Sequence, residues 1–142
     1  MSLSDTLQAL GLKREILLVR IFKTKAFQRW AEKINLHNES LLQAIVQLQH
    51  GQYEANLGGH LYKKRIAINN KGKSGGLRTI IAFKKEDKAF FVYGFAKNRI
   101  ENIYEAEIIA LKDLAKIYFL YNDEQIKNAL INKTFIEVIN NG

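Results

Sequence analysis

The chain has 142 residues, of which 47% are hydrophobic and 25% charged, with a formal net charge of +8 and no Cys. This length and composition predict one globular domain, and they exclude disulfide frameworks, thiolate nucleophiles and Cys-ligated metal sites. The opening segment lacks the pattern of a secretion signal, and its longest apolar piece, residues 16–19, is far shorter than the roughly 20 residues that span a bilayer. We therefore expect a cytoplasmic protein that does not contact a membrane.

The N-terminal part of the chain predicts one strand followed by two helices. Residues 16–22 are mostly β-branched or aromatic, which is typical of a strand. An apolar stripe at helical spacing follows, with Thr24 as the expected N-cap. A second stripe over residues 41–48 predicts another helix, capped by Asn38 or Ser40.

The middle of the chain predicts three strands at residues 61–68, 77–83 and 89–96. Residues 84–88 carry lysines and acids and suit an exposed hairpin loop between the last two strands. Because the connections are short, the three strands should form an antiparallel meander. In the strand at residues 61–68, neither side is purely apolar, which is typical of a surface for a polar ligand.

The C-terminal part predicts a longer amphipathic helix that begins at about residue 103, with acidic residues near its start that complement the helix dipole. A short helix capped by Asn122 or Asp123 should follow, and residues 134–139 read as a last strand. The sequence shows no internal repeat and no linker that would mark a domain boundary.

Most of the excess positive charge lies between residues 61 and 100. This segment holds eleven Lys and Arg against Glu86 and Asp87, a balance of +9, whereas the rest of the chain sums to −1. If the predicted hairpin forms, Arg78 and Lys97 meet at the same end of the ladder. Cations gathered there could neutralise a phosphodiester and stabilise a pentacoordinate phosphorane. A solvated lysine-rich surface is the alternative interpretation.

Metal and nucleotide sites are not indicated. His37, His50 and His60 are far apart in the sequence and fit no metal-binding motif. The stretch "GKSGG" matches neither the dinucleotide fingerprint nor the phosphate-binding loop of nucleotide hydrolases, and no helix is expected after it. We therefore predict neither a metal nor a cofactor.

Three stretches together resemble a known family. The chain contains "LYKKRIA", "KGKSGGLRTIIAF" and "AFFVYGFAKN" in this order. Their combination is similar to the RelE/HigB branch of bacterial type II toxin–antitoxin toxins, within the RelE/ParE superfamily. The resemblance implies an α+β fold, in which two N-terminal helices and a C-terminal helix pack on a curved antiparallel sheet of about four or five strands. It also implies a single RelE-like domain over residues 1–142, with residues 1–18 as an N-terminal extension.

The resemblance further implies a metal-independent endoribonuclease, an mRNA interferase that cuts the message in the ribosomal A site and thereby inhibits translation. Its partners would be mRNA, the ribosome and a cognate antitoxin of the helix-turn-helix type. Two alternatives remain open: a ParE-like toxin that binds DNA gyrase without cutting RNA, and an RNA-binding module without catalysis. One fold can host each of these functions.

By the same resemblance the catalytic residues would be Lys73, Arg78 and Lys97, which we expect to meet at one solvent-facing pocket. Arg78 would stabilise the phosphorane and Lys73 would act as the base or as a charge partner. Lys97 would hold the phosphate or protonate the leaving oxygen. Tyr93 or Tyr104 could stack on a base or transfer a proton. The further candidates for phosphate binding are Lys63, Lys64, Arg65, Lys71, Asn98 and Arg99.

Overall fold

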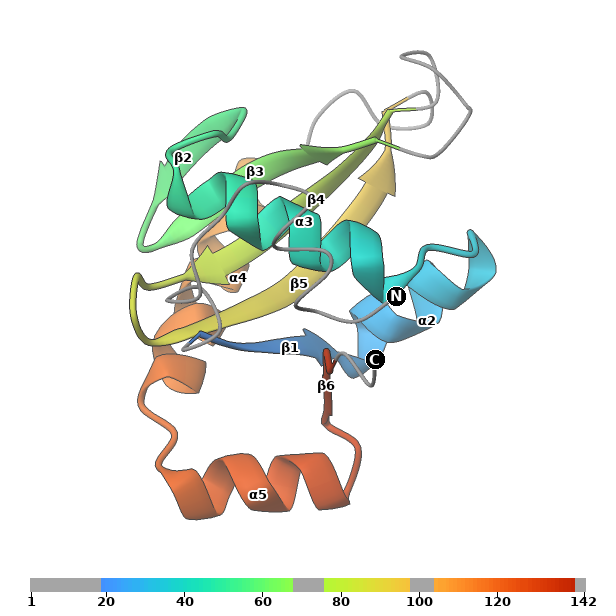
Figure 1. The fold of residues 1–142 in the computed structure, drawn as a ribbon. Coiled ribbons are helices and arrows are strands. Elements are labelled where there is room, and N and C mark those ends of the chain that lie inside the picture. Colours follow the sequence, from blue (N-terminus) through green and yellow to red (C-terminus); the bar gives the residue numbers. More distant parts are fainter. Residues whose placement is uncertain (1–18, 68–75, 98–103, 140–142) are drawn as a thin grey trace.

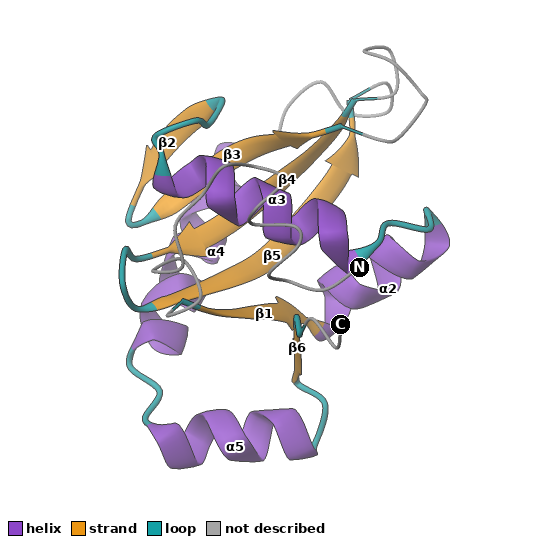
Figure 2. Ribbon diagram, in the orientation of Figure 1, coloured by secondary structure: helices purple, strands orange, loops and turns teal. Residues whose placement is uncertain are grey.

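The computed structural model describes residues 19–67, 76–97 and 104–139, which form a sheet with helices on both of its faces (Figure 1 and Figure 2). In chain order the elements are β1 (Arg20–Thr24), α2 (Lys25–Lys33), α3 (Asn38–Gln49), β2 (Ala55–Gly58), β3 (Leu61–Ile66), β4 (Leu77–Phe83), β5 (Lys88–Ala96), α4 (Glu105–Phe119), α5 (Asp123–Ile131) and β6 (Phe135–Glu137). The strand order in the sheet is β2-β3-β4-β5-β1-β6. Neighbouring strands are antiparallel except β1 and β5, which run parallel.

The predicted α+β class is confirmed, and so is the meander of β3, β4 and β5. β4 has the predicted bounds and β5 begins one residue earlier than expected. Two features differ from the prediction. β2 is an additional strand that pairs only with β3, so the described sheet has six strands instead of four or five. The parallel pairing of β1 with β5 also differs from the predicted antiparallel sheet, whereas both helices predicted after residue 100 are present as α4 and α5.

Local side-chain contacts explain where the first two helices begin. The Thr24 Oγ1 accepts a hydrogen bond of 3.2 Å from the Phe27 N–H, which confirms the predicted N-cap of α2. α3 begins at Asn38 with His37 at the N-cap position, so neither predicted cap is correct. The Asn38 Oδ1 instead accepts a hydrogen bond of 3.0 Å from the Lys23 ammonium, which ties α3 to β1.

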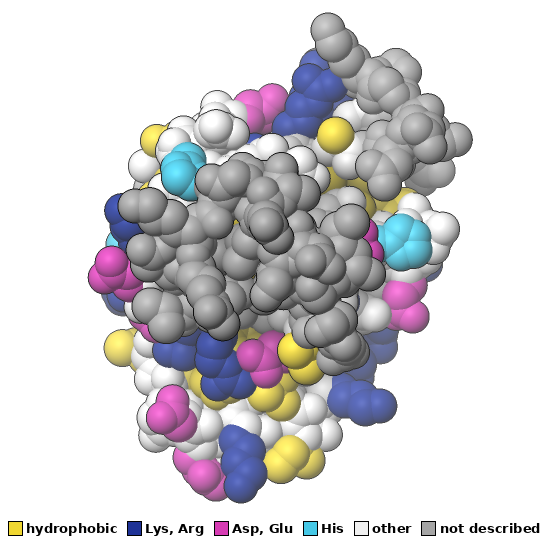
Figure 3. Space-filling model, viewed as in Figure 1, with side chains coloured by type: hydrophobic (Ala, Val, Ile, Leu, Met, Phe, Trp, Pro, Cys, Tyr) yellow, Lys and Arg dark blue, Asp and Glu magenta, His cyan; other side chains and the backbone are white. Residues whose placement is uncertain are grey.

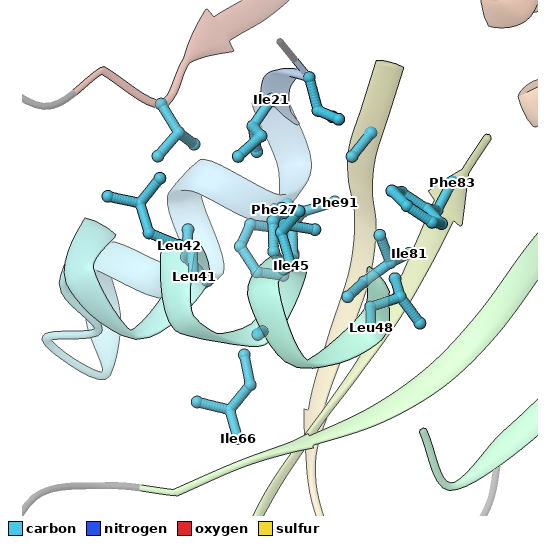
Figure 4. Packing of buried hydrophobic residues seen from close by; sticks show 14 of the residues in the cluster. Ile21, Phe27, Leu41, Leu42, Ile45, Leu48, Ile66, Ile81, Phe83 and Phe91 are labelled. Atoms are coloured by element: carbon cyan, nitrogen blue, oxygen red, sulfur yellow. The ribbon is translucent and has the colours of Figure 1, made fainter. Parts of the chain in front are cut away.

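The core on the side of the sheet that faces α2 and α3 is aliphatic with a few large rings (Figure 4). Leu41 and Ile45 of α3 and Phe27 of α2 are fully buried against the sheet residues Ile81 and Phe91. Burying each of these side chains stabilises the fold by about 1.5–3 kcal/mol. The two helices therefore fix this face of the sheet firmly.

The opposite side of the sheet is aromatic. The rings of Phe22, Phe90 and Phe135 lie 5.2 to 5.7 Å apart, and Tyr118 of α4 meets Phe135 edge-on at 4.8 Å. α5 begins at a capping box in which Asn122, one of the two predicted caps, is the N-cap. Among the described helices, none has the length and hydrophobicity needed to cross a membrane.

Candidate functional site

The ladder of β3, β4 and β5 brings predicted site residues together at one end. Arg78 in β4 lies opposite Arg65 in β3 and Phe95 in β5, and the Lys97 N–H donates a hydrogen bond of 3.3 Å to the Gly76 carbonyl. Residues that lie opposite each other, or two positions apart along a strand, project from the same face of a sheet. Arg65, Arg78 and Lys97 therefore belong to one face, the face on which α4 packs.

Arg78 is buried and is fixed by an acidic partner. Only 5% of the residue is exposed, and its Nε lies 2.9 and 3.1 Å from the two carboxylate oxygens of Glu54. Its Nη1 is also buried, and within the described part of the chain it has no hydrogen-bond partner. The sequence predicted a solvent-facing cation, whereas the structure gives a held guanidinium with one unsatisfied donor.

Glu54 bridges two cations of the site. Besides Arg78, the Lys63 ammonium lies 3.4 Å from the same carboxylate. Desolvation by burial raises the pKa of Glu54, but the hydrogen bond from Arg78 and the charges of Arg78 and Lys63 outweigh it and leave that pKa below its ordinary value. The carboxylate is therefore ionised at neutral pH, and it orients the guanidinium of Arg78 through a charge-assisted hydrogen bond.

Lys64 lies on the other face of the sheet. It pairs with Thr79, whose hydroxyl donates a hydrogen bond of 2.9 Å to the Lys64 carbonyl, and only 8% of Lys64 is exposed. Burial lowers the pKa of its ammonium. The structure thus separates Lys64 from Arg65 and Arg78, with which the sequence grouped it as a phosphate-binding candidate.

The two tyrosine candidates have different environments. Tyr93 lies opposite Ile80 on the same face as Arg78, and its pKa is raised by desolvation and by the charge and hydrogen bond of Glu107. A tyrosine phenol is protonated at neutral pH, and the raised pKa reinforces this state. Tyr93 can therefore donate a hydrogen bond or offer a ring face. Tyr104 occupies the N-cap position of α4 and is 73% exposed.

Four of the predicted site residues lie outside the described residues. They are Lys71, Lys73, Asn98 and Arg99. The described part of the site therefore consists of Lys63, Arg65, Arg78 and Lys97 with the carboxylate of Glu54 between two of them.

Sequence reasoning missed Glu54, which lies between the second predicted helix and the strand predicted at residues 61–68, where no element was assigned. Its N–H donates a hydrogen bond of 2.8 Å to the Lys63 carbonyl, so it lies across from β3 just before β2 begins. The signal that could have found it is the Gly58–Gly59 pair at the end of β2, since Gly59 and His60, both with positive φ, form the two-residue turn of a short hairpin. Pairing of that hairpin places Glu54 beside Lys63.

Positive charge on the α3 side of the molecule is not arranged in the same way. On the part of this side that Figure 3 shows in colour, Lys and Arg side chains lie in separate groups at the upper edge and around the lower rim. The described cations that share one end of the ladder instead project from the opposite face of the sheet.

Comparison with known proteins identifies the family of this chain. The family model described as "RelE toxin of RelE / RelB toxin-antitoxin system" matches residues 19–138. No curated protein matches the chain. Because the family model spans well over half of the sequence, this chain belongs to the RelE toxin family, whose members are the toxins of toxin–antitoxin systems and have an antitoxin as partner.

Proposed function

We propose that this toxin is a ribosome-dependent mRNA endoribonuclease that works without a metal ion and inhibits translation in the cytoplasm. Its family supports the toxin assignment, and the cations at one end of the β3–β5 ladder support a phosphodiester as the substrate. The antitoxin, proposed to be of the helix-turn-helix type, would block this face of the sheet.

The proposed reaction is an internal transfer at phosphorus. The 2′-oxygen of a ribose attacks the adjacent phosphorus, and the bond from phosphorus to the 5′-oxygen of the next nucleotide breaks. The proton of the 2′-hydroxyl passes to a base, and a second proton reaches the leaving 5′-oxygen. The products are a 2′,3′-cyclic phosphate and a free 5′-hydroxyl, with no net change in protons.

Arg78 is the residue that carries this proposal. A buried donor without a partner costs about 1–3 kcal/mol, so a structure keeps one where a ligand supplies the acceptor. The Arg78 Nη1 is such a donor, and Glu54 holds the guanidinium in place through Nε. Because Nη1 is buried in this structure, a phosphate oxygen would reach and satisfy it once binding displaces the groups that cover it, and the fixed positive charge would then stabilise the phosphorane.

The lysines have supporting roles. Lys97 is exposed two residues after Phe95, and there it would hold the phosphate or protonate the leaving oxygen. Lys73 would act as the base or as a charge partner, a role that rests on the family resemblance. Glu54 is a positioning residue for Arg78, since its lowered pKa makes it a weak proton acceptor.

The ribosome would supply much of the remaining catalysis. Holding the 2′-oxygen in line with the leaving oxygen can contribute about 7–11 kcal/mol to barrier reduction. A site without a His and Glu pair can therefore cut RNA when the A site fixes the message. This explains why the activity is proposed to depend on the ribosome.

The experiment compares the wild-type toxin with Arg78→Ala and with Lys127→Gln, an exposed cation on α5 far from the site. Each protein is expressed in cells, and mRNA ends are mapped by primer extension. We expect cuts within A-site codons for wild type and Lys127→Gln, and a loss of at least 100-fold for Arg78→Ala, the order seen when a preorganised donor is removed. Cleavage by Arg78→Ala at the wild-type rate, or inhibition of DNA supercoiling by gyrase without RNA cuts, would contradict the proposal.

A further inference from the structure

The end of α3, the start of β3 and the loop that joins β4 to β5 lie at the far end of β4 from Arg78 (Figure 1). A cavity of about 510 Å³ lies between these three segments. Phe83 in its wall is five residues along the strand from Arg78, a separation of about 17 Å. Phe83 packs in the α3 cluster, whereas Arg78 shares its face with Phe95 in the α4 cluster, so the cavity and the candidate site lie on different faces of the sheet. The lining residues that matter here are Gln49, Tyr53, His60, Tyr62, Lys84 and Lys85.

The cavity has an aromatic wall with one accessible ring. Tyr53 is 42% exposed, and its ring centroid lies 5.0 Å from that of Tyr62 at an interplanar angle of 58°. Tyr62 in turn meets Phe83 edge-on at 6.3 Å. The rings therefore support one another, and a planar group that enters the cavity can stack on a ring that is already held in place.

The rim of the cavity is cationic. The Lys84 ammonium lies 4.9 Å from the centroid of the Phe119 ring of α4, which also receives the edge of His60 at 5.9 Å, so these two side chains are engaged on the α4 side. Lys85 is exposed beside Lys84. No acidic residue among the described ones lines the cavity. Asp87 of the same loop pairs with Lys88 at 3.0 Å.

These features together select the class of ligand. A cavity for an apolar side chain of a protein partner would not need two lysines, and a simple anion site would not need a wall of rings. A volume of about 510 Å³ falls within the range of about 300–1,000 Å³ that is typical of small-ligand sites. Aromatic rings for stacking next to a cation for the phosphate are the means by which proteins bind single-stranded RNA.

We propose that this cavity binds one nucleotide of a single-stranded RNA, with the base against the rings of Tyr53 and Tyr62 and the phosphate against Lys85. The identification of the ligand as RNA rests on the proposed function, whereas the cavity shares no residue with the Arg78 site. This second contact, on the other face of the sheet from Arg78, raises the affinity for RNA and fixes the position of the strand along the protein. It takes no part in the cleavage step.

The test measures the binding of fluorescein-labelled hexauridylate to the full-length protein by fluorescence anisotropy in the absence of ribosomes. We expect Tyr53→Ala to weaken binding by about tenfold or more and Tyr53→Phe to retain it, since stacking needs the ring and not the hydroxyl. Lys85→Gln should lower the slope of log affinity against log salt by about 0.7, the value for one phosphate contact to a single strand. Lys127→Gln is the matched control and should leave the slope unchanged.

Absence of hexauridylate binding by the wild-type protein, or equal affinities for Tyr53→Ala and wild type, would overturn the inference. Thermal melting followed by circular dichroism checks that Tyr53→Ala is folded, and Lys85→Gln provides an independent readout. A failure of the proposed function is seen separately, because it appears as mRNA cleavage that survives Arg78→Ala. The same Tyr53 dependence measured in an Arg78→Ala background shows that the RNA is bound at the cavity.

Discussion

Glu54 and Arg78, which are 24 positions apart in the sequence, meet so that one guanidinium donor lies within 3.1 Å of both carboxylate oxygens. Glu54 precedes the edge strand β2, and Arg78 is the second residue of β4, so the contact spans β3. This arrangement fixes the plane of the guanidinium and leaves its Nη1 without an acceptor among the described residues. The acid therefore turns a flexible side chain into an oriented donor.

Replacing Glu54 by Gln should reduce cleavage more than it reduces stability. The amide keeps the size of the carboxylate but loses its charge, so Arg78 is held less firmly. Because the Glu54 side chain is 36% exposed, we expect a loss of about 1 kcal/mol in the free energy of unfolding, measured by urea denaturation. A cleavage rate that falls by about tenfold or more, measured by primer extension, would reflect the lost orientation of Arg78.

Glu137→Gln is the control for that prediction. Glu137 accepts two hydrogen bonds of 2.9 Å from Arg20 at the β1–β6 edge of the sheet, away from the ladder end that carries Arg78. The Glu137→Gln substitution should lower the free energy of unfolding by a similar amount and leave cleavage at the wild-type rate. Equal cleavage rates for Glu54→Gln and Glu137→Gln would mean that Glu54 does not position Arg78.

The contribution of Glu54 to stability should depend on pH in a defined direction. Desolvation raises its pKa, but the contacts with Arg78 and Lys63 hold it below the ordinary value of 4.5. Since the folded pKa is below the unfolded one, the stabilisation is fully present above pH 4.5 and is lost as the pH falls through the folded value. The difference in unfolding free energy between wild type and Glu54→Gln should therefore shrink between pH 7 and about pH 3. A constant difference over this range would contradict the ion pair.

The sequence could predict the parts of the fold that depend on local pattern. β4 is a mostly apolar run, interrupted by Arg78 and Thr79 and bounded by Gly76 and a charged loop, and its bounds agree with the prediction. Thr24 is an N-cap because its hydroxyl reaches the N–H three residues later, which is also a local relation. β2 was missed because it is a four-residue edge strand with only half-buried apolar residues, whose pairing with β3 includes a bulge.

The candidate site also has one part that local sequence pattern predicts and one part that it does not. The meeting of Arg78 with the residues near Lys97 follows from a tight hairpin, and sequence pattern was sufficient to predict it. The burial of Arg78 was not predicted, because it depends on Glu54, which reaches the site only when β2 pairs with β3. The four residues of β2 are too few to give a clear periodic signal, so their pairing with β3 was not predicted.

Lys64→Met should stabilise the protein at neutral pH. Lys64 is buried, and burial lowers the pKa of its ammonium below 10.5. Because the folded pKa lies below the unfolded one, the charged form destabilises the native state at neutral pH, and this cost fades as the pH rises through the folded pKa. We expect a gain of about 1 kcal/mol at pH 7 that vanishes near pH 10.5, measured by urea denaturation at both values.

Lys63→Met provides the comparison for that variant, since it changes the neighbouring residue on the other face. Lys63 is paired with Glu54 at 3.4 Å, so its loss removes a favourable contact. It should therefore not stabilise the protein at pH 7. A stabilisation of the same size by both substitutions would show that lysine burial at position 64 is not the cause.

Gly94→Ala should disrupt the packing of α2 on β5. A Cβ at position 94 would overlap the Trp30 ring, which lies directly on the glycine. Overpacking of this kind costs about 1–3 kcal/mol of unfolding free energy. Because Trp30 is the single tryptophan of the chain, its fluorescence spectrum reports the displacement of the ring directly.

A double-mutant cycle separates this overlap from a general effect of alanine in β5. In a Trp30→Leu background the ring is absent, so adding Gly94→Ala should cost much less than it does in the wild-type protein. Gly94 is also flanked by Tyr93 and Phe95, which belong to the same face as Arg78, so a displaced β5 would shift the ladder end and lower cleavage. An unchanged urea midpoint and an unchanged Trp30 spectrum for Gly94→Ala would show that the ring does not pack on position 94.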